Sequence, residues 1–285
     1  MPYITVQPGY VLSTTHFMES LCLQNGISHF YEFITDRSGD NPFPEFPHGC
    51  FDIRFSCDPE HPDGSLLGTC LSFQEPHLKP DTRYFGIRFQ CGFLPGFLLS
   101  SMREFLGQEL PLSECINRND AFLAEKIALA DSFQSRISVF MDFYSHQEFR
   151  NDFFTVLTAD CVGRILSLNG DLSVDQLARE FLYSRRYLEK AFQATLGISP
   201  NQLCRIVRFQ NFLYNLSRKP QNKLTELALE NGYYDQSHLI RDFKYFTSTT
   251  PKKYAGIIVH KNYASRLHDY NLFGQQDSPD VLPLL

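Results

Sequence analysis

Residues 176–200 read QLAREFLYSRRYLEKAFQATLGISP, and residues 226–251 repeat the same pattern as ELALENGYYDQSHLIRDFKYFTSTTP. Leu188, Phe192 and Pro200 recur 51 positions later, whereas Leu177 and Ala178 recur 50 positions later, so the second copy is one residue longer in its turn. We interpret the stretch from residue 172 to residue 254 as a two-helix unit that is repeated once.

Each copy has the spacing of two short helices joined by a turn. In the first copy, Ser173 and Gln176 have the spacing of a capping box, which predicts the start of a helix. Ser184 is a second N-cap residue, and the apolar side chains of Leu188 and Phe192 follow it at a four-residue step. The second helix of each copy therefore buries an apolar face against the first helix.

The opposite faces of these second helices carry basic and hydrogen-bonding side chains. These are Arg185, Arg186, Glu189 and Lys190 in the first copy, and Gln236, His238, Arg241 and Lys244 in the second. A helix with apolar anchors inside and such groups outside can enter the major groove of DNA.

A single long helix is expected between the two copies. Ser199 and Gln202 form a further capping box, Pro200 occupies the first helical position, and no helix breaker follows before Pro220. A rigid spacer fixes the separation of the two outer faces, which must be about 34 Å if both face the same side of DNA. One protomer would then contact two successive major grooves.

These motifs resemble the AraC/XylS family of bacterial transcription regulators, whose DNA-binding domain has two helix-turn-helix units joined by a long helix. The second copy matches through Leu227-Ala228, Gly232-Tyr233, Asp235, Ser237-His238-Leu239, Arg241, Phe243-Lys244 and Pro251, and the first through Leu177-Ala178, Ser184, Arg186-Tyr187-Leu188, Phe192 and Gly197-Ile198-Ser199-Pro200. Ser248 replaces the usual glycine, Leu203 a common aromatic and Phe212 a common alanine, which affects packing rather than the outer faces. The match covers about a third of the chain.

The resemblance implies a set of DNA contacts. Arg186, Glu189 and Lys190 lie at positions that the family uses for base contacts, and in the second copy Gln236 suits adenine and Arg241 suits guanine. Other implied DNA-binding residues are Ser184, Arg185, Tyr187, Asp235, Ser237, His238 and Lys244, of which Arg185, Lys244 and the two N-cap residues suit phosphate. Alternatively, some charges pair along a helix, for example Arg185 with Glu189.

The distribution of charge separates the doubled unit from the rest of the chain. The 285 residues suit two domains, and the net charge is −6. Residues 171–254 hold 13 Lys and Arg against 8 Asp and Glu, whereas the rest of the chain holds 13 against 24. Basic charge is therefore concentrated where DNA binding is expected.

The remaining composition predicts a cytoplasmic protein. Eight cysteines without a C-x-x-C pair, in a chain that starts without a basic region and an apolar leader, favour a reducing compartment over a disulfide framework. No apolar run approaches the roughly 20 residues that span a bilayer.

The N-terminal part has the texture of a small β-rich domain. Strands are expected over residues 28–35, 50–57, 65–73 and 83–93, with loops over residues 36–42 and 58–64. We predict an α+β protein in which a β-barrel or sandwich precedes the all-helical domain. Residues 47–53 and 85–89 resemble segments of the cupin-like N-terminal domains of some family members. The expected divisions are residues 1–115, a connector over 116–150, the DNA-binding domain over 151–256 and a tail over 257–285.

In this family such an N-terminal domain often binds a small effector. Residues 1–150 contain 18 of the 27 phenylalanines, which favours either an aromatic cavity or, more often, a solidly packed core. Arg54 and Arg88 are candidate effector-binding residues for a carboxylate or polar group, although such arginines commonly pair with a neighbouring acid such as Asp52.

The connector has a helical pattern over residues 119–147, and residues 152–168 are expected to form the first helix of the DNA-binding domain. Between Ala130 and Tyr144 the apolar spacing alternates between three and four, as in the seam between two packed helices. Phe133, Ile137 and Phe140 in this seam could form a dimer contact or clamp the helix on the β-domain, and the family resemblance favours a homodimer.

No catalytic or metal-binding motif is recognised. His16, His29, His48, His61 and His77 are scattered without a His-x-His pair, so neither a metal nor another cofactor is expected. The sequence contains no phosphate-binding glycine loop and no nucleophile elbow. The predicted function is an effector-modulated transcription regulator that binds promoter DNA and RNA polymerase, not an enzyme. The alternatives are a barrel enzyme or chemical sensor fused to a DNA-binding domain, in which Cys50, Cys57, Cys70 or Cys91 would react, and a protein-interaction scaffold.

Overall fold

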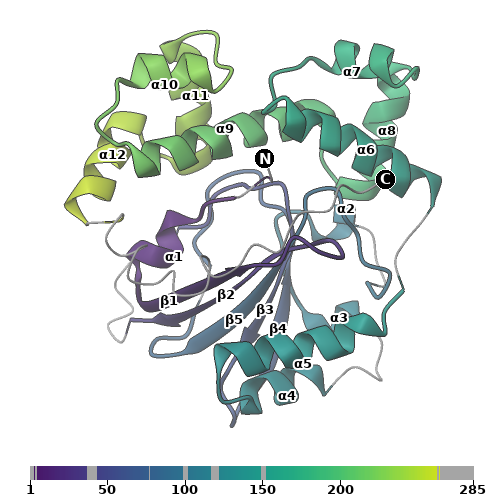
Figure 1. Cartoon of the computed structure of the whole chain (residues 1–285), viewed down its shortest axis with the longest axis vertical. Helices are drawn as coiled ribbons and strands as arrows, with labels where there is room; N and C mark the ends of the chain where they lie inside the picture. The colour runs from purple at the N-terminus through teal and green to yellow at the C-terminus, as the bar shows by residue number, and fades with distance from the viewer. Residues whose placement is uncertain are drawn as a thin grey trace, which may run out of the picture.

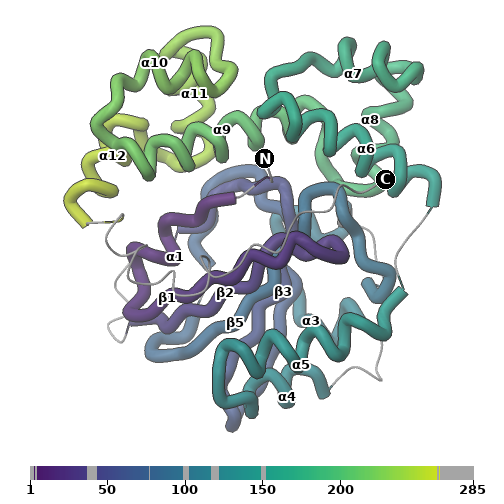
Figure 2. Tube along the Cα trace, viewed as in Figure 1, coloured from purple at the N-terminus to yellow at the C-terminus, as the bar shows by residue number. Residues whose placement is uncertain are grey.

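The protein has a β-sheet layer and a helical layer (Figure 1). The computed structural model describes residues 3, 5–36, 44–76, 78–98, 102–116, 122–148, 152–261 and 263. Figure 2 shows the chain passing through the sheet first and then into the helical part. The predicted fold class, an N-terminal β-rich domain followed by an all-α domain, is confirmed, but the expected barrel or sandwich is a single open sheet in the described part of the chain.

The β-rich part is one six-stranded antiparallel sheet with the strand order β1-β2-β5-β3-β4-β6. The strands are β1 (Thr14–Leu21), β2 (Ile27–Thr35), β3 (Asp52–Ser56), β4 (Asp63–Leu67), β5 (Arg83–Phe89) and β6 (Glu109–Pro111). The four expected strands correspond to β2, β3, β4 and β5. β1 and β6, the two edge strands, were not predicted, because β1 is half polar and β6 has three residues.

The two faces of the sheet differ in chemistry. One face carries Phe30, Ile53, Phe85 and Ile87, all essentially inaccessible to solvent, and belongs to a core dominated by aromatic side chains. Its cover includes α4 (Leu123–Leu129) and α5 (Phe133–Ser145). Most of the phenylalanines therefore serve solid packing, as the simpler sequence interpretation proposed. The opposite face, toward the helical domain, carries charged side chains.

The connector is two helices rather than one continuous helix. α4 ends at Leu129, and Ser132 starts α5 through a capping box with Ser135. Phe133, Phe140 and Tyr144, from the alternating seam, are buried in the core beneath the sheet of their own chain. The seam therefore clamps α5 on the sheet, and the interpretation of these side chains as a dimer contact is wrong.

The helical domain begins with α6 (Phe153–Ser167), the helix expected over residues 152–168, and Asp152 caps it. It continues through α7 (Val174–Glu180), α8 (Arg185–Leu196), α9 (Pro200–Arg218), α10 (Leu224–Glu230), α11 (Gln236–Thr247) and α12 (Pro251–His260). The shorter helices of the sheet domain are α1 (Pro8–Leu12), α2 (Met102–Phe105) and α3 (Leu112–Cys115). α12 carries the helical part beyond residue 256, and the expected tail beyond residue 263 lies outside the described residues.

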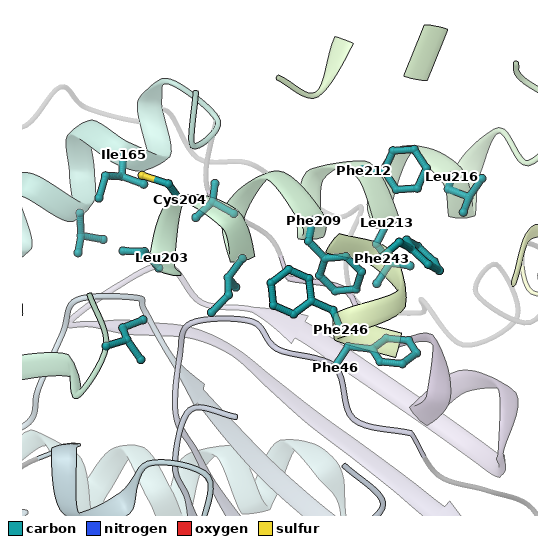
Figure 3. Close-up of a cluster of buried hydrophobic side chains, with 14 of the residues drawn as sticks. Phe46, Ile165, Leu203, Cys204, Phe209, Phe212, Leu213, Leu216, Phe243 and Phe246 are labelled. Atoms are coloured by element: carbon teal, nitrogen blue, oxygen red, sulfur yellow. The ribbon is translucent and has the colours of Figure 1, made fainter. Parts of the chain in front are cut away.

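The two domains share a core along α9. Phe46, between β2 and β3 in the sheet domain, packs edge-on against Phe209 of α9 and Tyr254 of α12, with ring centroids 6.2 and 5.6 Å apart. Figure 3 shows Phe46 below Phe209 and near Phe246. The fully buried side chain of Gln210 accepts a hydrogen bond from the Val6 N–H at 2.8 Å and donates one to the Pro47 carbonyl at 2.7 Å. The sheet domain is thus hydrogen-bonded to the helix that joins the two copies of the repeat.

Candidate nucleic-acid interface

The helix starts predicted from the sequence are made by side-chain caps. Ser173, Ser184 and Ser199 each accept a hydrogen bond from the backbone N–H three residues on, at 3.2 Å, and Asp235 does so at 2.7 Å. Each cap satisfies a backbone donor that would otherwise lack an intrahelical partner. These bonds fix where α7, α8, α9 and α11 begin, and thereby which side chains of α8 and α11 face outward.

The inner and outer faces of α8 and α11 are divided as predicted. Leu188 and Phe192 of α8 and Leu239 and Phe243 of α11 are completely buried. The outer side chains Arg185, Arg186, Lys190, Gln236, Ser237, Arg241 and Lys244 are exposed, as are the caps Ser184 and Asp235, while Tyr187, Glu189 and His238 are half-buried. Each second helix therefore offers a polar ridge that is anchored from behind by apolar packing.

The two helix-turn-helix units are attached to each other as well as to α9. Figure 1 shows α7 and α8 near one end of α9, and α10 and α11 near the other. Arg208 of α9 donates a hydrogen bond from Nη1 to the Gly170 carbonyl at 2.8 Å. A Cβ atom at Gly232, in the turn of the second unit, would lie 3.1 Å from Cβ of Asp171. The loop before the first unit thus contacts the turn of the second, and this contact restrains their relative orientation.

Besides the caps, the predicted DNA-binding residues Arg185, Glu189 and His238 contact other side chains of the protein. Arg185 Nε donates to Glu189 Oε1 at 2.9 Å, which is the pairing along the helix that the sequence left open. Such an exposed pair is worth a few tenths of a kcal/mol, so it is easily exchanged for contacts with DNA. His238 Nε2 lies 3.7 Å from Asp242 Oδ2, and its ring packs edge-on against Tyr233. His238 is therefore turned toward its own unit rather than outward.

The two arginines predicted to bind an effector are buried in ion pairs. Arg54 contacts Glu45 at 3.2 Å and Glu109 at 3.1 Å, and Arg88 contacts Asp52 through Nε at 2.8 Å and Nη2 at 2.7 Å. Burial opposes ionisation of Asp52, but the attraction of Arg88 outweighs it and lowers the pKa of this carboxyl to about 2. Pairing with Asp52, the simpler alternative, is confirmed for Arg88. Neither guanidinium is placed to meet a ligand directly.

Beside this charged face lies a cavity of about 310 Å³. Its lining includes Glu45, His48, Asp52, Gln74, Glu75 and Glu109. No sequence signal pointed to Glu45, Glu75 or Glu109, because two of them lie outside the helices and strands and the third lies in the three-residue strand β6.

Comparison with known proteins identifies the helical domain. A family model described as a helix-turn-helix domain matches residues 177–256, and a domain of unknown function, DUF6597, matches residues 15–111. This chain has the helix-turn-helix domain of the AraC/XylS family. The AraC-type domain thus covers both copies of the repeat and the whole of α9.

Curated relatives are similar to this chain over part of their length. An uncharacterised HTH-type transcriptional regulator of Staphylococcus aureus strain COL is 29% identical over 131 residues, which are 45% of this chain and 17% of the relative. Another, from Haemophilus influenzae, is 32% identical over 84 residues, which are 30% of this chain and 28% of the relative. The matched segments thus span less than a third of these relatives.

Solved structures of ToxT from Vibrio cholerae are also similar. A 1.65 Å structure of ToxT gives a TM-score of 0.46 at 13% identity and covers 85% of this chain and 99% of ToxT. ToxT bound to (E)-4-(8-methylnaphthalen-1-yl)but-3-enoic acid gives a TM-score of 0.44 at 13% identity, over 86% of this chain and 99% of ToxT.

The cysteines of the chain are reduced thiols, one of which has a perturbed pKa. All eight cysteines are free. A hydrogen bond with the Cys91 thiol, opposed by burial and aided by His48, lowers the pKa of Cys50 to about 6. Within the described ranges, no three His, Cys, Asp or Glu side chains group as metal ligands do, and His77 lies outside those ranges. Nor does any helix in the described part have the length and apolarity needed to cross a membrane.

Proposed function

We propose that this chain is a sequence-specific transcription regulator in which one protomer reads two successive major grooves of promoter DNA with α8 and α11. The observation that carries the proposal is the pair of exposed polar ridges, each anchored by two completely buried apolar side chains and both attached to α9. Basic residues concentrate in this part of the chain, as DNA binding requires.

The proposed contacts divide into base reading and backbone positioning. Arg186, Glu189 and Lys190 of α8, with Gln236 and Arg241 of α11, read base edges. Ser184, Arg185, Tyr187, Asp235, Ser237, His238 and Lys244 lie toward the phosphates or the helix starts. Because His238 contacts Asp242 and Tyr233 of its own unit, we assign it to positioning the helix rather than to base reading.

Around this DNA-binding part we propose a sheet domain over residues 1–115 that receives a small effector, and a connector over residues 116–150. RNA polymerase at the promoter and a second copy of the chain are the proposed protein partners, and the cytoplasm is the proposed compartment. A dimer would have to use a surface other than the buried seam of α5. This role requires binding and no catalysis.

Binding-site selection with the full chain tests the proposal. We expect two preferred base clusters whose centres lie about 10 base pairs apart, since both helices enter the same side of the duplex. Affinity should fall steeply as salt rises, because phosphate contacts release counterions. A protein-interaction scaffold would instead show no salt-dependent affinity for any selected duplex.

A further inference from the structure

The sheet face toward α9 carries buried charged side chains at positions where apolar side chains would stabilise the fold more. Arg54, Arg88 and Asp52 are each nearly inaccessible, although burying charges is costly even when they are paired. The opposite face of the same sheet is mainly aromatic and aliphatic, and it also carries the buried Glu32, which pairs with Arg83 and Arg136. What distinguishes the charged face toward α9 is the 310 Å³ cavity that lies beside it.

The charge that faces this cavity is negative. Glu45, Asp52, Glu75 and Glu109 contribute four carboxylates to its lining, and none of the lining residues that the structure describes is Lys or Arg. The guanidiniums of Arg54 and Arg88 pair with three of these carboxylates from outside the lining. Four negative groups against two positive groups leave an excess of two negative charges, which repels a carboxylate ligand and attracts a cation.

One carboxylate of the lining has an oxygen atom that accepts no hydrogen bond from the described residues. Glu45 is 7% exposed, and its Oε1 accepts hydrogen bonds from the Tyr10 hydroxyl and from Arg54. Its Oε2 has no hydrogen-bond partner among the residues that the structure describes. This oxygen is not among the buried side-chain atoms that lack a partner, so it is open to solvent, and an N–H donor of a ligand in the cavity can bond to it.

The chain segment that carries Glu45 also contacts α9. In the segment of residues 45–50, Glu45 and His48 line the cavity. Phe46, between them, packs against Phe209 of α9 (Figure 3). The Pro47 carbonyl accepts the hydrogen bond from Gln210 of α9. A displacement of this segment by a ligand would therefore act directly on the helix that spaces the two DNA-reading helices.

We propose that the cavity binds a small organic cation with N–H donors, such as an amine or guanidine compound, and that the segment of residues 45–50 transmits its occupancy to α9. The volume lies at the lower end of the range for small-molecule sites, which limits the ligand to a compact one. The binding part stands by itself, whereas the transmission part rests on the proposed DNA-binding function.

Calorimetry on the full chain tests the binding part with two probes of matched length and opposite charge, 1,4-diaminobutane and succinate. The diamine should bind at least tenfold more tightly than succinate. Glu45→Gln keeps the shape and one acceptor oxygen but removes the charge, and should weaken diamine binding at least fivefold. Glu75→Gln, at an exposed position where a substitution has little effect on folding, should weaken it about threefold.

Glu60→Gln is the matched control, because Glu60 is exposed and does not line the cavity. Its diamine affinity should equal that of the unmodified chain. Equal binding of succinate and diamine, or unchanged diamine affinity in both Glu45→Gln and Glu75→Gln, would overturn the assignment of the ligand class.

The transmission part is tested by titrating a selected DNA duplex with and without saturating diamine. The DNA affinity should change by about fivefold or more, and DNA should change the affinity for diamine by the same factor, because coupling between two sites is reciprocal. Gln210→Ala should bring this factor close to one while diamine still binds. If saturating diamine changes the DNA affinity by less than twofold, or if Gln210→Ala leaves that change as large as in the unmodified chain, transmission through α9 is overturned.

The two proposals fail differently. A chain that binds DNA but neither probe refutes the cation site and leaves the regulator intact. A chain that binds diamine but no duplex at low salt refutes the proposed regulator, and transmission to DNA binding with it.

Discussion

Substitutions of the turn residue in each helix-turn-helix unit test whether backbone conformation decides which residue each turn accepts. Leu182 in the first turn and Gly232 in the second are 50 positions apart, as are the matching Leu177 and Leu227, and both have left-handed backbone angles, with φ of 60° and 73°. Leu182 is 90% exposed. Gly232 faces Asp171 and the side chain of Arg208, so its turn is enclosed.

The free energies expected from this geometry have opposite signs at the two sites. A left-handed residue other than glycine costs roughly 1–2 kcal/mol, whereas glycine loses about 0.5–1 kcal/mol more backbone entropy on folding. Leu182→Gly should therefore stabilise by up to about 1 kcal/mol, since its exposed side chain loses little packing. Gly232→Ala should destabilise by about 1–2 kcal/mol, because its Cβ would also meet Asp171 Cβ at 3.1 Å and Arg208 Cδ at 3.3 Å.

Urea denaturation of the full chain, followed by circular dichroism at 222 nm, measures both changes. Gly163→Ala is the matched control, because this exposed glycine lies within α6 and a Cβ there would contact nothing within 4 Å. It should stabilise by about 0.5–1 kcal/mol through helix propensity alone. A neutral Gly232→Ala, or a Leu182→Gly variant less stable than the unmodified chain, would show that backbone conformation does not decide these two turns.

Four further outcomes are expected. Arg186→Ala and Arg241→Ala should each cost about 1–3 kcal/mol at one base position, with the two positions about 10 base pairs apart, and uniform loss in a binding-site selection would make them phosphate contacts. Lys244→Ala should weaken binding to all duplexes alike and reduce the salt slope by about one, so an unchanged slope contradicts its phosphate role. Burial raises the pKa of Glu19 from 4.5 to about 7, so its contribution to stability, present in acid, is lost as pH rises through 7. Glu19→Gln should therefore gain about 3 kcal/mol over the unmodified chain between pH 4.5 and pH 8, whereas parallel pH profiles would refute this. Phe140→Ala should cost about 3–5 kcal/mol at every protein concentration, because Phe140 is completely buried within its own chain, and a cost that varies with concentration would restore an intermolecular seam.

The helical domain could be predicted from the sequence because helix caps and apolar spacing depend on residues only a few positions apart. Ser173, Ser184 and Ser199 cap the helices they were expected to cap, and α9 runs without interruption to Arg218, just before the expected stop. The predicted outer faces are exposed for the same reason, since the four-residue step of buried side chains leaves the other side of the helix to solvent.

The features that the sequence did not reveal depend on contacts between distant segments. Gln210 looks like a polar interruption of an apolar helix face, and its partners Val6 and Pro47 are 204 and 163 residues away in sequence. Glu45 and Glu109 are 64 positions apart and are brought together by Arg54 of β3. The break before Ser132 was missed because the apolar spacing continues across it, although α4 and α5 are separate helices.

The contacts of α9 bear on how a regulator of this shape can respond to a signal. Its Arg208 holds the loop before the first helix-turn-helix unit, and two residues later Gln210 holds the sheet domain. Leaving the fully buried amide of Gln210 and its two backbone partners without hydrogen bonds costs about 1–3 kcal/mol for each unsatisfied group. The contact between the sheet domain and α9 therefore has two favoured arrangements. In one, Gln210 is hydrogen-bonded to Val6 and Pro47 away from water, and in the other the domains separate and water replaces these bonds. Because Arg208 and Gln210 lie on the same rigid helix, such an opening at the sheet would also change the surroundings of the contact that orients the two DNA-reading helices.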